Sequence, residues 1–399
     1  MTAWIRWTDD AGRPQRARWR SLAGHPPPAR VVAADERMPV ATAFALADGG
    51  TGLLWRGDYH AARDLLAALA HRLPTVASAP GAAPAAVFAA QREAQARRAR
   101  LLGMLLLPVD TDHRVPLKRA PDLRAAGAQA HGPADEPYVE SLRELLGLVG
   151  AYEWRRKGVP IPALGARIHP HHGVFSPIRG EYVDLVARAA LPAAAAAAGA
   201  FDIGTGTGVL AALLARRGLR VTATDIDERA LACAADNIAR LGLRRAVQVQ
   251  RADLFPPGRA GLAVCNPPWL PGRADSTLEA AVYDPDSRML RGFLAGLAAH
   301  LVPGGEGWLI LSDFAEHLGL RSRATLLGWI VAGGLRVLAR DDVKPRHGRA
   351  ADTADPLHAA RRAETTSLWR LGLSGDAGPA ARRDTPPAGR PHRSQRRGR

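Results

Sequence analysis

The stretch Ala200-Phe201-Asp202-Ile203-Gly204-Thr205-Gly206-Thr207-Gly208 decides the fold expected for this chain. A short apolar run gives way to three glycines at alternate positions, and an apolar segment at residues 209–218 follows directly. This order predicts a buried strand, a glycine-rich turn and a helix that a glycine ends. Glycines let the backbone pass close to a ligand at the amino terminus of a helix. We therefore expect an open α/β sheet with a ligand site at its carboxyl edge.

The spacing of these glycines distinguishes a dinucleotide site from a site for another ligand. The pattern is G-x-G-x-G, and Val209 stands where a dinucleotide fingerprint has its third glycine. Asp202 precedes the first glycine by two positions, where its carboxylate would repel a pyrophosphate and attract an aminocarboxylate cation. A dehydrogenase is therefore disfavoured.

Acidic residues come after the next predicted strands. The strand expected at residues 221–224 leads to Asp225, which is placed to accept hydrogen bonds from both hydroxyls of a ribose. Asp227 is interpreted as the cap of a helix at residues 228–241.

A further acid, Asp253, follows the strand expected at residues 247–250. It is placed to accept from the amino group of an adenine, while Leu254 or Ile226 packs against the ring. Each acid taken singly is more often a helix cap or a turn residue. Their order after successive strands favours a nucleoside site.

Asn266-Pro267-Pro268-Trp269 follows the apolar run 262–265, which predicts a fourth strand. Two prolines cannot continue a ladder, so the chain must leave the sheet at Asn266. The Asn266 side-chain oxygen and the Pro267 carbonyl can accept both hydrogens of a planar amino group, and Trp269 can stack on the flat system that bears it. A Pro-Pro turn with a packed tryptophan is the structural alternative for this stretch alone.

Together these motifs resemble the class I S-adenosylmethionine-dependent methyltransferases, and more narrowly the "small-domain" amino-group methyltransferases. That group includes rRNA guanine-N2 and adenine-N6 methyltransferases and the release-factor glutamine-N5 methyltransferases. The resemblance covers roughly residues 140–374 and implies a Rossmann-like sheet of seven strands. It departs at Trp269, where the group usually has Tyr or Phe, and this leaves the substrate ring open.

The resemblance also implies a role for each motif. Asp202 and the glycines would hold the methionine part of S-adenosylmethionine, Asp225 the ribose and Asp253 the adenine, while residues 175–183 would close over the cofactor. The expected cofactor-binding residues are Asp202, Gly204, Thr205, Gly206, Gly208, Asp225, Ile226, Asp253, Leu254 and Asn266. The expected catalytic residues, which hold the target amine, are Asn266, Pro267, Pro268 and Trp269.

The chain is expected to contain an α/β methyltransferase domain, a smaller amino-terminal α+β domain and a disordered basic tail. Their expected bounds are residues 136–374, 1–135 and 375–399. The first domain is predicted to have strands at 3–7, 30–34, 52–55 and 105–109, helices at 59–73 and 87–104, and loops at 78–86 and 115–137. A helix is expected at 138–148. After the Asn-Pro-Pro-Trp motif we expect a substrate-facing loop (270–286), helices (289–301, 315–332), a turn (303–305), strands (306–312, 335–339, 365–371) and a basic insertion (344–349).

Three further features are candidates for functional sites. Two of them have both a structural and a functional interpretation, and the third is not predicted to be a site. The arginines of the second predicted helix (Arg92, Arg97, Arg98 and Arg100) are more typical of a solvated face than of a phosphate-contacting one. The aromatic and basic segment 152–158 suits base stacking, or is a local amphipathic turn. His169-Pro170-His171-His172 lacks accompanying carboxylates or cysteines at ligand spacing, so no metal site is predicted.

The composition is that of a globular protein, because 47% of the 399 residues are hydrophobic and 23% are charged. A net charge of +16 favours a polyanion partner, above all RNA, although an arginine excess in an alanine-rich chain can also follow from genomic base composition. The two cysteines, Cys233 and Cys265, lie in apolar contexts and indicate a reducing compartment. With no signal peptide or spanning segment recognised, we expect a cytoplasmic protein.

These observations predict an enzyme that moves a methyl group from S-adenosylmethionine to a planar amino nitrogen. The favoured acceptor is adenine N6 or guanine N2 in rRNA or tRNA. The alternative acceptor is glutamine N5 of a protein. An RNA-binding module with an inactive cofactor fold is the alternative from another class.

Overall fold

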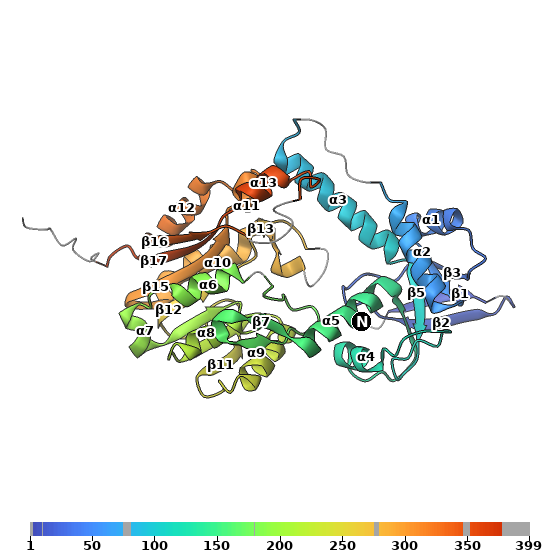
Figure 1. Ribbon diagram of the computed structural model, residues 1–399, viewed down its shortest axis with the longest axis horizontal. Helices are drawn as coiled ribbons and strands as arrows, with labels where there is room; N and C mark the ends of the chain where they lie inside the picture. Colours follow the sequence, from blue (N-terminus) through green and yellow to red (C-terminus); the bar gives the residue numbers. More distant parts are fainter. Residues whose placement is uncertain are drawn as a thin grey trace, which may run out of the picture.

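The computed structural model describes residues 3–9, 11–74, 81–178, 180–274, 279–345 and 352–376. Two large sheets organise these residues, and they occupy opposite ends of the molecule in Figure 1. The predicted tail from residue 377 onward and residues 346–349 of the basic insertion lie outside the described residues.

The second half of the chain forms a seven-stranded sheet in the order β11-β10-β9-β12-β15-β17-β16. Numbered one to seven along the chain, this order is 3-2-1-4-5-7-6. Strand β17 runs antiparallel to both of its neighbours, and the remaining pairs are parallel. The strands are β9 (Ala200–Ile203), β10 (Val221–Asp225), β11 (Val247–Arg251), β12 (Ala260–Cys265), β15 (Leu301–Ser312), β16 (Leu335–Val343) and β17 (Thr366–Leu373).

Helices cover both faces of this sheet, because its central strands are apolar on both sides. One core contains side chains of α6, α7, α8 and α9, and the other contains side chains of α10 and α12. The helices are α6 (Glu181–Arg188), α7 (Ala193–Ala198), α8 (Val209–Arg216), α9 (Glu228–Arg240), α10 (Arg288–Leu297), α11 (Phe314–His317), α12 (Arg323–Ala332) and α13 (His358–Ala363). Two small two-stranded sheets pair β7 (Val159–Ile161) with β8 (Ala166–Ile168), and β13 (Leu270–Pro271) with β14 (Tyr283–Asp284).

The first half of the chain forms a six-stranded mixed sheet in the order β1-β2-β6-β5-β4-β3. Separate apolar clusters cover its two faces. Its strands are β1 (Trp4–Thr8), β2 (Pro14–Trp19), β3 (Arg30–Ala34), β4 (Thr51–Trp55), β5 (Leu105–Val109) and β6 (Tyr138–Ser141). Its helices are α1 (Val40–Asp48), α2 (Tyr59–His71), α3 (Pro84–Leu102), α4 (Arg124–His131) and α5 (Leu142–Lys157).

The predicted elements are mostly confirmed. Corrections are needed where pairing with another strand, or a helix cap, sets the type or the bounds of an element. The helix expected at 138–148 is wrong at its start, because residues 138–141 pair with β5 and β2 as β6. Ser141 then caps α5, with its Oγ 3.1 Å from the Glu144 amide. The helix expected at 315–332 is two helices, since Ser322 caps a new one, and the turn expected at 303–305 lies within β15. Strand β2 and helices α1 and α4 were not predicted, and α4 lies in the expected loop 115–137.

The packing of α7 on the sheet depends on Gly261 in β12. A Cβ atom at this position would overlap the backbone of Ala194 and Ala195. We expect Gly261→Ala to lower the free energy of unfolding by about 1–3 kcal/mol, measured by urea denaturation. Gly147→Ala is the control, because a Cβ there in α5 meets nothing within 4 Å. It should stabilise by about 0.5–1 kcal/mol. Equal stability of wild type and Gly261→Ala would contradict this account of the contact.

None of the described helices combines the length and the apolar character needed to cross a membrane.

Candidate active site

A cavity of 520 Å³ lies at the carboxyl edge of the seven-stranded sheet. The segments that follow β9, β10, β11 and β12 meet there, as expected of an open α/β sheet. The structure brings nearly all of the predicted site residues to its wall. These are Asp202, Gly204, Thr205, Gly206, Asp225, Ile226, Asp253, Leu254, Asn266, Pro267, Pro268 and Trp269.

Gly208 is the one predicted site residue that is not among the lining residues. It precedes α8 with a φ of +79°, and a Cβ there would come within 3.2 Å of the Ala234 Cα atom in α9. In the described structure Gly208 therefore allows α8 and α9 to pack closely together. Gly204 and Gly206, with φ of +70° and +54°, form the part of the loop that faces the cavity.

Asp202 is buried in the floor of the cavity and ties the glycine loop to α8. Its Oδ2 atom accepts hydrogen bonds from the Thr205 hydroxyl at 2.6 Å and from the Ala211 amide at 2.9 Å. Burial raises the pKa of Asp202 to about 6. The same carboxylate thus shapes the loop and adds negative charge to the cavity.

The raised pKa of Asp202 has a consequence for stability. A carboxyl group with a higher pKa in the folded state stabilises the fold when it is protonated. This contribution is complete below the ordinary pKa of 3.8 and is lost as the pH rises through about 6. We expect Asp202→Asn, relative to wild type, to gain on the order of 3 kcal/mol in unfolding free energy between about pH 4 and pH 7. Urea denaturation at both pH values tests this, and a difference that does not change with pH would contradict it.

Asp225 stands at the end of β10 and holds two backbone amides. Its Oδ2 accepts from Gly206 at 3.0 Å and its Oδ1 accepts from Asp227 at 3.0 Å. Burial raises its pKa. Asp227 caps α9 through the Arg229 amide, as predicted. Asp225 is thereby fixed against the glycine loop and faces the cavity.

The far end of the cavity has an exposed apolar wall. The Ile226 side chain is 54% exposed although it is aliphatic, and it lines the cavity. Leu254, at a φ of +75°, is fixed by a hydrogen bond from the Thr224 hydroxyl to its carbonyl at 2.7 Å. The Asp253 carboxylate accepts from Arg288 at 2.7 Å. An apolar surface beside acceptor groups is suited to a purine ring.

The Asn-Pro-Pro-Trp motif leaves the sheet where predicted, directly after β12 ends at Cys265. The Trp269 indole Nε1 donates to the Asn266 Oδ1 atom at 2.9 Å. Trp269 also packs against the sheet core, so the packed-tryptophan interpretation is correct in part. An amide oxygen has two lone pairs, so the indole leaves one acceptor position on Asn266. The indole therefore orients Asn266 within the cavity wall.

Two further walls of the cavity were not predicted. Phe88, Gln91, Arg92 and Gln95 come from α3, at the spacing i, i+3, i+4, i+7 that places them on one helix face. The other wall includes Phe314, the first residue of α11 after β15, and Glu364, which lies between α13 and β17. The only sequence signal for the first wall was the helix pattern with its arginines.

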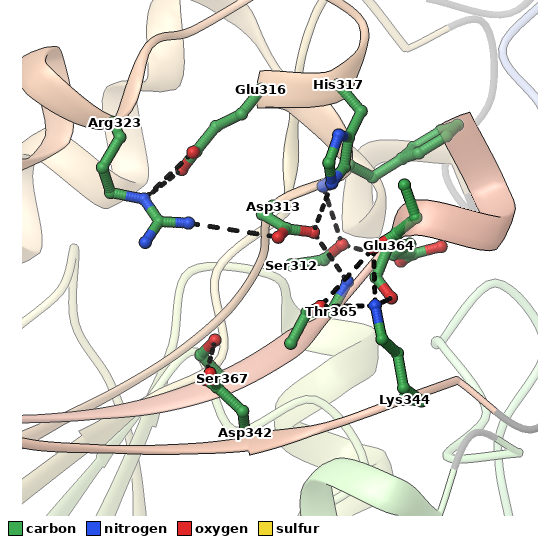
Figure 2. Close-up of polar contacts among 12 residues, drawn as sticks. Ser312, Asp313, Glu316, His317, Arg323, Asp342, Lys344, Glu364, Thr365 and Ser367 are labelled. Atoms are coloured by element: carbon green, nitrogen blue, oxygen red, sulfur yellow. Dashed lines mark hydrogen bonds and ion pairs between the residues drawn. The ribbon is translucent and has the colours of Figure 1, made fainter. Parts of the chain in front are cut away.

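Figure 2 shows the polar network that holds the second wall. The Ser312 hydroxyl donates to Glu364 at 2.7 Å, and the Thr365 amide donates to Asp313 at 2.6 Å. The Lys344 ammonium donates to the Glu364 carbonyl at 3.2 Å, which joins the end of β16 to the network. These bonds fix the edge on which Phe314 and Glu364 face the cavity.

The remaining candidate features make contacts within the protein. His169 and His171 contact α9 through Asn237 and Asp236. Within the described ranges no group of three or more potential metal ligands occurs. Of the arginines in α3, Arg97 pairs with Asp48 and Arg98 donates to the Ala70 carbonyl. The segment 152–158 lies mainly in α5, and its Arg155 pairs with Asp236.

The strand order and the cavity at the carboxyl edge together define a class I methyltransferase fold, as the sequence predicted. The family described as "Methyltransferase small domain" matches residues 165–322 of the chain. The resemblance inferred from the motifs is thus confirmed, and the match supports S-adenosylmethionine as the cofactor.

Several curated proteins are similar to parts of the chain. Ribosomal RNA small subunit methyltransferase C of Alcanivorax borkumensis is 30% identical over 31% of this chain and 38% of its own length. Release factor glutamine methyltransferase of Cereibacter sphaeroides is 33% identical over 40% of this chain and 58% of its own. A tRNA1(Val) (adenine(37)-N6)-methyltransferase of Vibrio parahaemolyticus is 40% identical over 17% of this chain and 30% of its own. The chain therefore spans less than two thirds of each of these relatives.

Proposed function

We propose that the chain is an S-adenosylmethionine-dependent N-methyltransferase acting on a planar amino nitrogen. One observation carries the proposal: the glycine loop after β9 and Asn266 after β12 line the same cavity. A direct methyl transfer needs the donor and the acceptor to lie next to each other in one cavity.

The residues present fit S-adenosylmethionine. Gly206 has a positive φ, and a Cβ built on it meets nothing within 4 Å, so the loop leaves open space beside the cavity. The buried Asp202 suits the cationic end of the cofactor, Asp225 the ribose hydroxyls, and Asp253 the adenine amino group, with Ile226 against the ring. When bound, the cofactor supplies an electrophilic methyl group on a sulfonium sulfur.

The chain's own part in the reaction is to position the acceptor. Asn266 Oδ1 and the Pro267 carbonyl accept hydrogen bonds from the two N–H groups of the acceptor amine. These bonds raise the electron density on a nitrogen whose lone pair is delocalised, and they aim it at the methyl group. The amine would be held with its N–H bonds on these two oxygens, and the proton that the methylated nitrogen loses would pass to solvent water. Orientation of this kind supplies several kcal/mol of the acceleration, so a strong base is not required.

For the acceptor we propose an exocyclic amine of a base, adenine N6 or guanine N2, in rRNA or tRNA. The net charge of +16 supports a polyanionic substrate, and relatives named for rRNA and tRNA methylation match this domain. We assign substrate recognition to the amino-terminal part and methyl transfer to residues 136–374. An RNA substrate also agrees with the cytoplasmic location expected from the sequence. Glutamine N5 of a protein is the second candidate, because release factor methyltransferases match the same region.

The experiment combines calorimetry with methyl transfer by the full chain. We expect S-adenosylmethionine to bind, and a labelled methyl group to enter total RNA from a strain that lacks the gene. Mass spectrometry of the nucleosides then identifies the acceptor. Binding to RNA should weaken as salt rises. Label in a release factor and not in RNA would establish the second candidate, and cofactor binding without transfer to either would establish an inactive binding module.

A further inference from the structure

Helix α3 connects the two halves of the molecule, and Figure 1 shows it running between them. Near its carboxyl end, Leu101 and Leu102 are buried in the amino-terminal core. Near its amino end, Val87 is buried with Leu270 and Phe314 of the methyltransferase half. Because both of its ends are anchored, α3 keeps the face that lines the cavity in a fixed position.

Arg92 anchors this face to the segment that follows the Asn-Pro-Pro-Trp motif. Its guanidinium donates to both carboxylate oxygens of Glu279, at 3.0 and 3.1 Å, and to the Arg273 carbonyl at 3.0 Å. It also lies 4.0 Å from the centre of the Tyr283 ring. A bidentate pair of this kind is geometrically specific. Arg92 is therefore committed to holding the wall, and its charge is offset by Glu279.

With the arginine engaged, the groups that α3 adds to the cavity are neutral. They are the ring of Phe88 and the side-chain amides of Gln91 and Gln95. Gln95 is exposed, and among the described residues the Gln91 amide makes a long contact, 3.4 Å, with Asp355. A primary amide offers one acceptor and two donors in a plane, which is the geometry that pairs with a base edge. An aromatic ring suits an unstacked base.

We propose that Phe88, Gln91 and Gln95 of α3 form the binding site for the acceptor base, with Phe88 against its ring and the amides against its edge. The ligand class is a nucleobase turned out of its stack, not a phosphate, because the wall carries no uncompensated charge. A protein glutamine has no ring for Phe88 to contact. The inference rests on the proposed methyl transfer to RNA and specifies where that reaction selects its acceptor.

The test uses the full chain with Gln95→Ala and Phe88→Ala, with total RNA from a strain lacking the gene as the methyl acceptor. The matched control is Gln248→Ala, an exposed glutamine on β11 outside the cavity. We expect kcat/KM for RNA to fall roughly 10-fold or more in Gln95→Ala, mainly through KM. The Kd for S-adenosylmethionine should stay within about twofold of wild type, because cofactor groups are untouched. Gln248→Ala should match wild type in both measurements.

The outcomes separate this inference from the function on which it rests. If wild type methylates RNA and Gln95→Ala and Phe88→Ala do so equally well, the base site is wrong and the function stands. If both variants lose S-adenosylmethionine binding in parallel with activity, the wall belongs to the cofactor site and the inference is again overturned. If wild type methylates a release factor and no RNA, the second candidate acceptor is established, and the base site falls together with the RNA acceptor while the methyl transfer stands. Gln95 is exposed, so its variant tests the site even if Phe88→Ala destabilises the fold.

Discussion

Asn266→Ala should abolish most of the turnover, by roughly 10²- to 10³-fold, while the affinity for S-adenosylmethionine stays nearly unchanged. The side-chain oxygen of Asn266 is the acceptor that orients the amine, and Trp269 holds it in place at 2.9 Å. Removing it leaves the glycine loop, Asp202 and Asp225 intact. Steady-state methyl transfer to RNA and calorimetry with the cofactor measure the two quantities.

Asn266→Asp is the companion variant, because it keeps an oxygen acceptor of the same shape. We expect its turnover to lie between that of wild type and Asn266→Ala. Unchanged turnover in Asn266→Ala would remove Asn266 from the reaction. A parallel loss of cofactor binding would move the residue to the cofactor site.

The second large effect is expected on cofactor affinity. Asp225→Ala should raise the Kd for S-adenosylmethionine by roughly 10²-fold, because two hydrogen bonds from the ribose to a charged acceptor are lost. The Gly206 amide also loses its acceptor, which loosens the loop. Calorimetry with the full chain measures the change.

Asp341→Ala serves as the control for Asp225→Ala, since Asp341 is an exposed acid on β16 away from the cavity. It should bind the cofactor as wild type does. Equal binding by Asp225→Ala and Asp341→Ala would exclude Asp225 from the cofactor site.

The part of the site that sequence predicts well is the part encoded by neighbouring residues. The loop after β9, the acid that ends β10 and the Pro-Pro exit after β12 each combine a strand with its own turn. Parallel strands bring such ends to one edge, so sequence order alone places them together. Gly208 shows the limit, because its position against Ala234 depends on the packing of α9.

The wall from α3 could not be predicted for the same physical reason. Arg92 and Glu279 are far apart in sequence, and no local pattern distinguishes an arginine that pairs across the molecule from one in solvent. The predicted solvated face was therefore too simple, since Arg97 also pairs with Asp48. The helix prediction at 138–148 failed for a different reason. Its first residues, Tyr138 and Val139, fit a strand or a helix, and pairing with β5 decided for the strand.

Because α3 lies between residues 84 and 102, the methyltransferase half does not enclose its own cavity. A chain cut at residue 136 would keep the glycine loop and Asn266 yet open one side of the chamber to water. Under the proposed function, sequence drift in the first half would change which molecule is modified, while the donor chemistry in the second half would stay under separate selection.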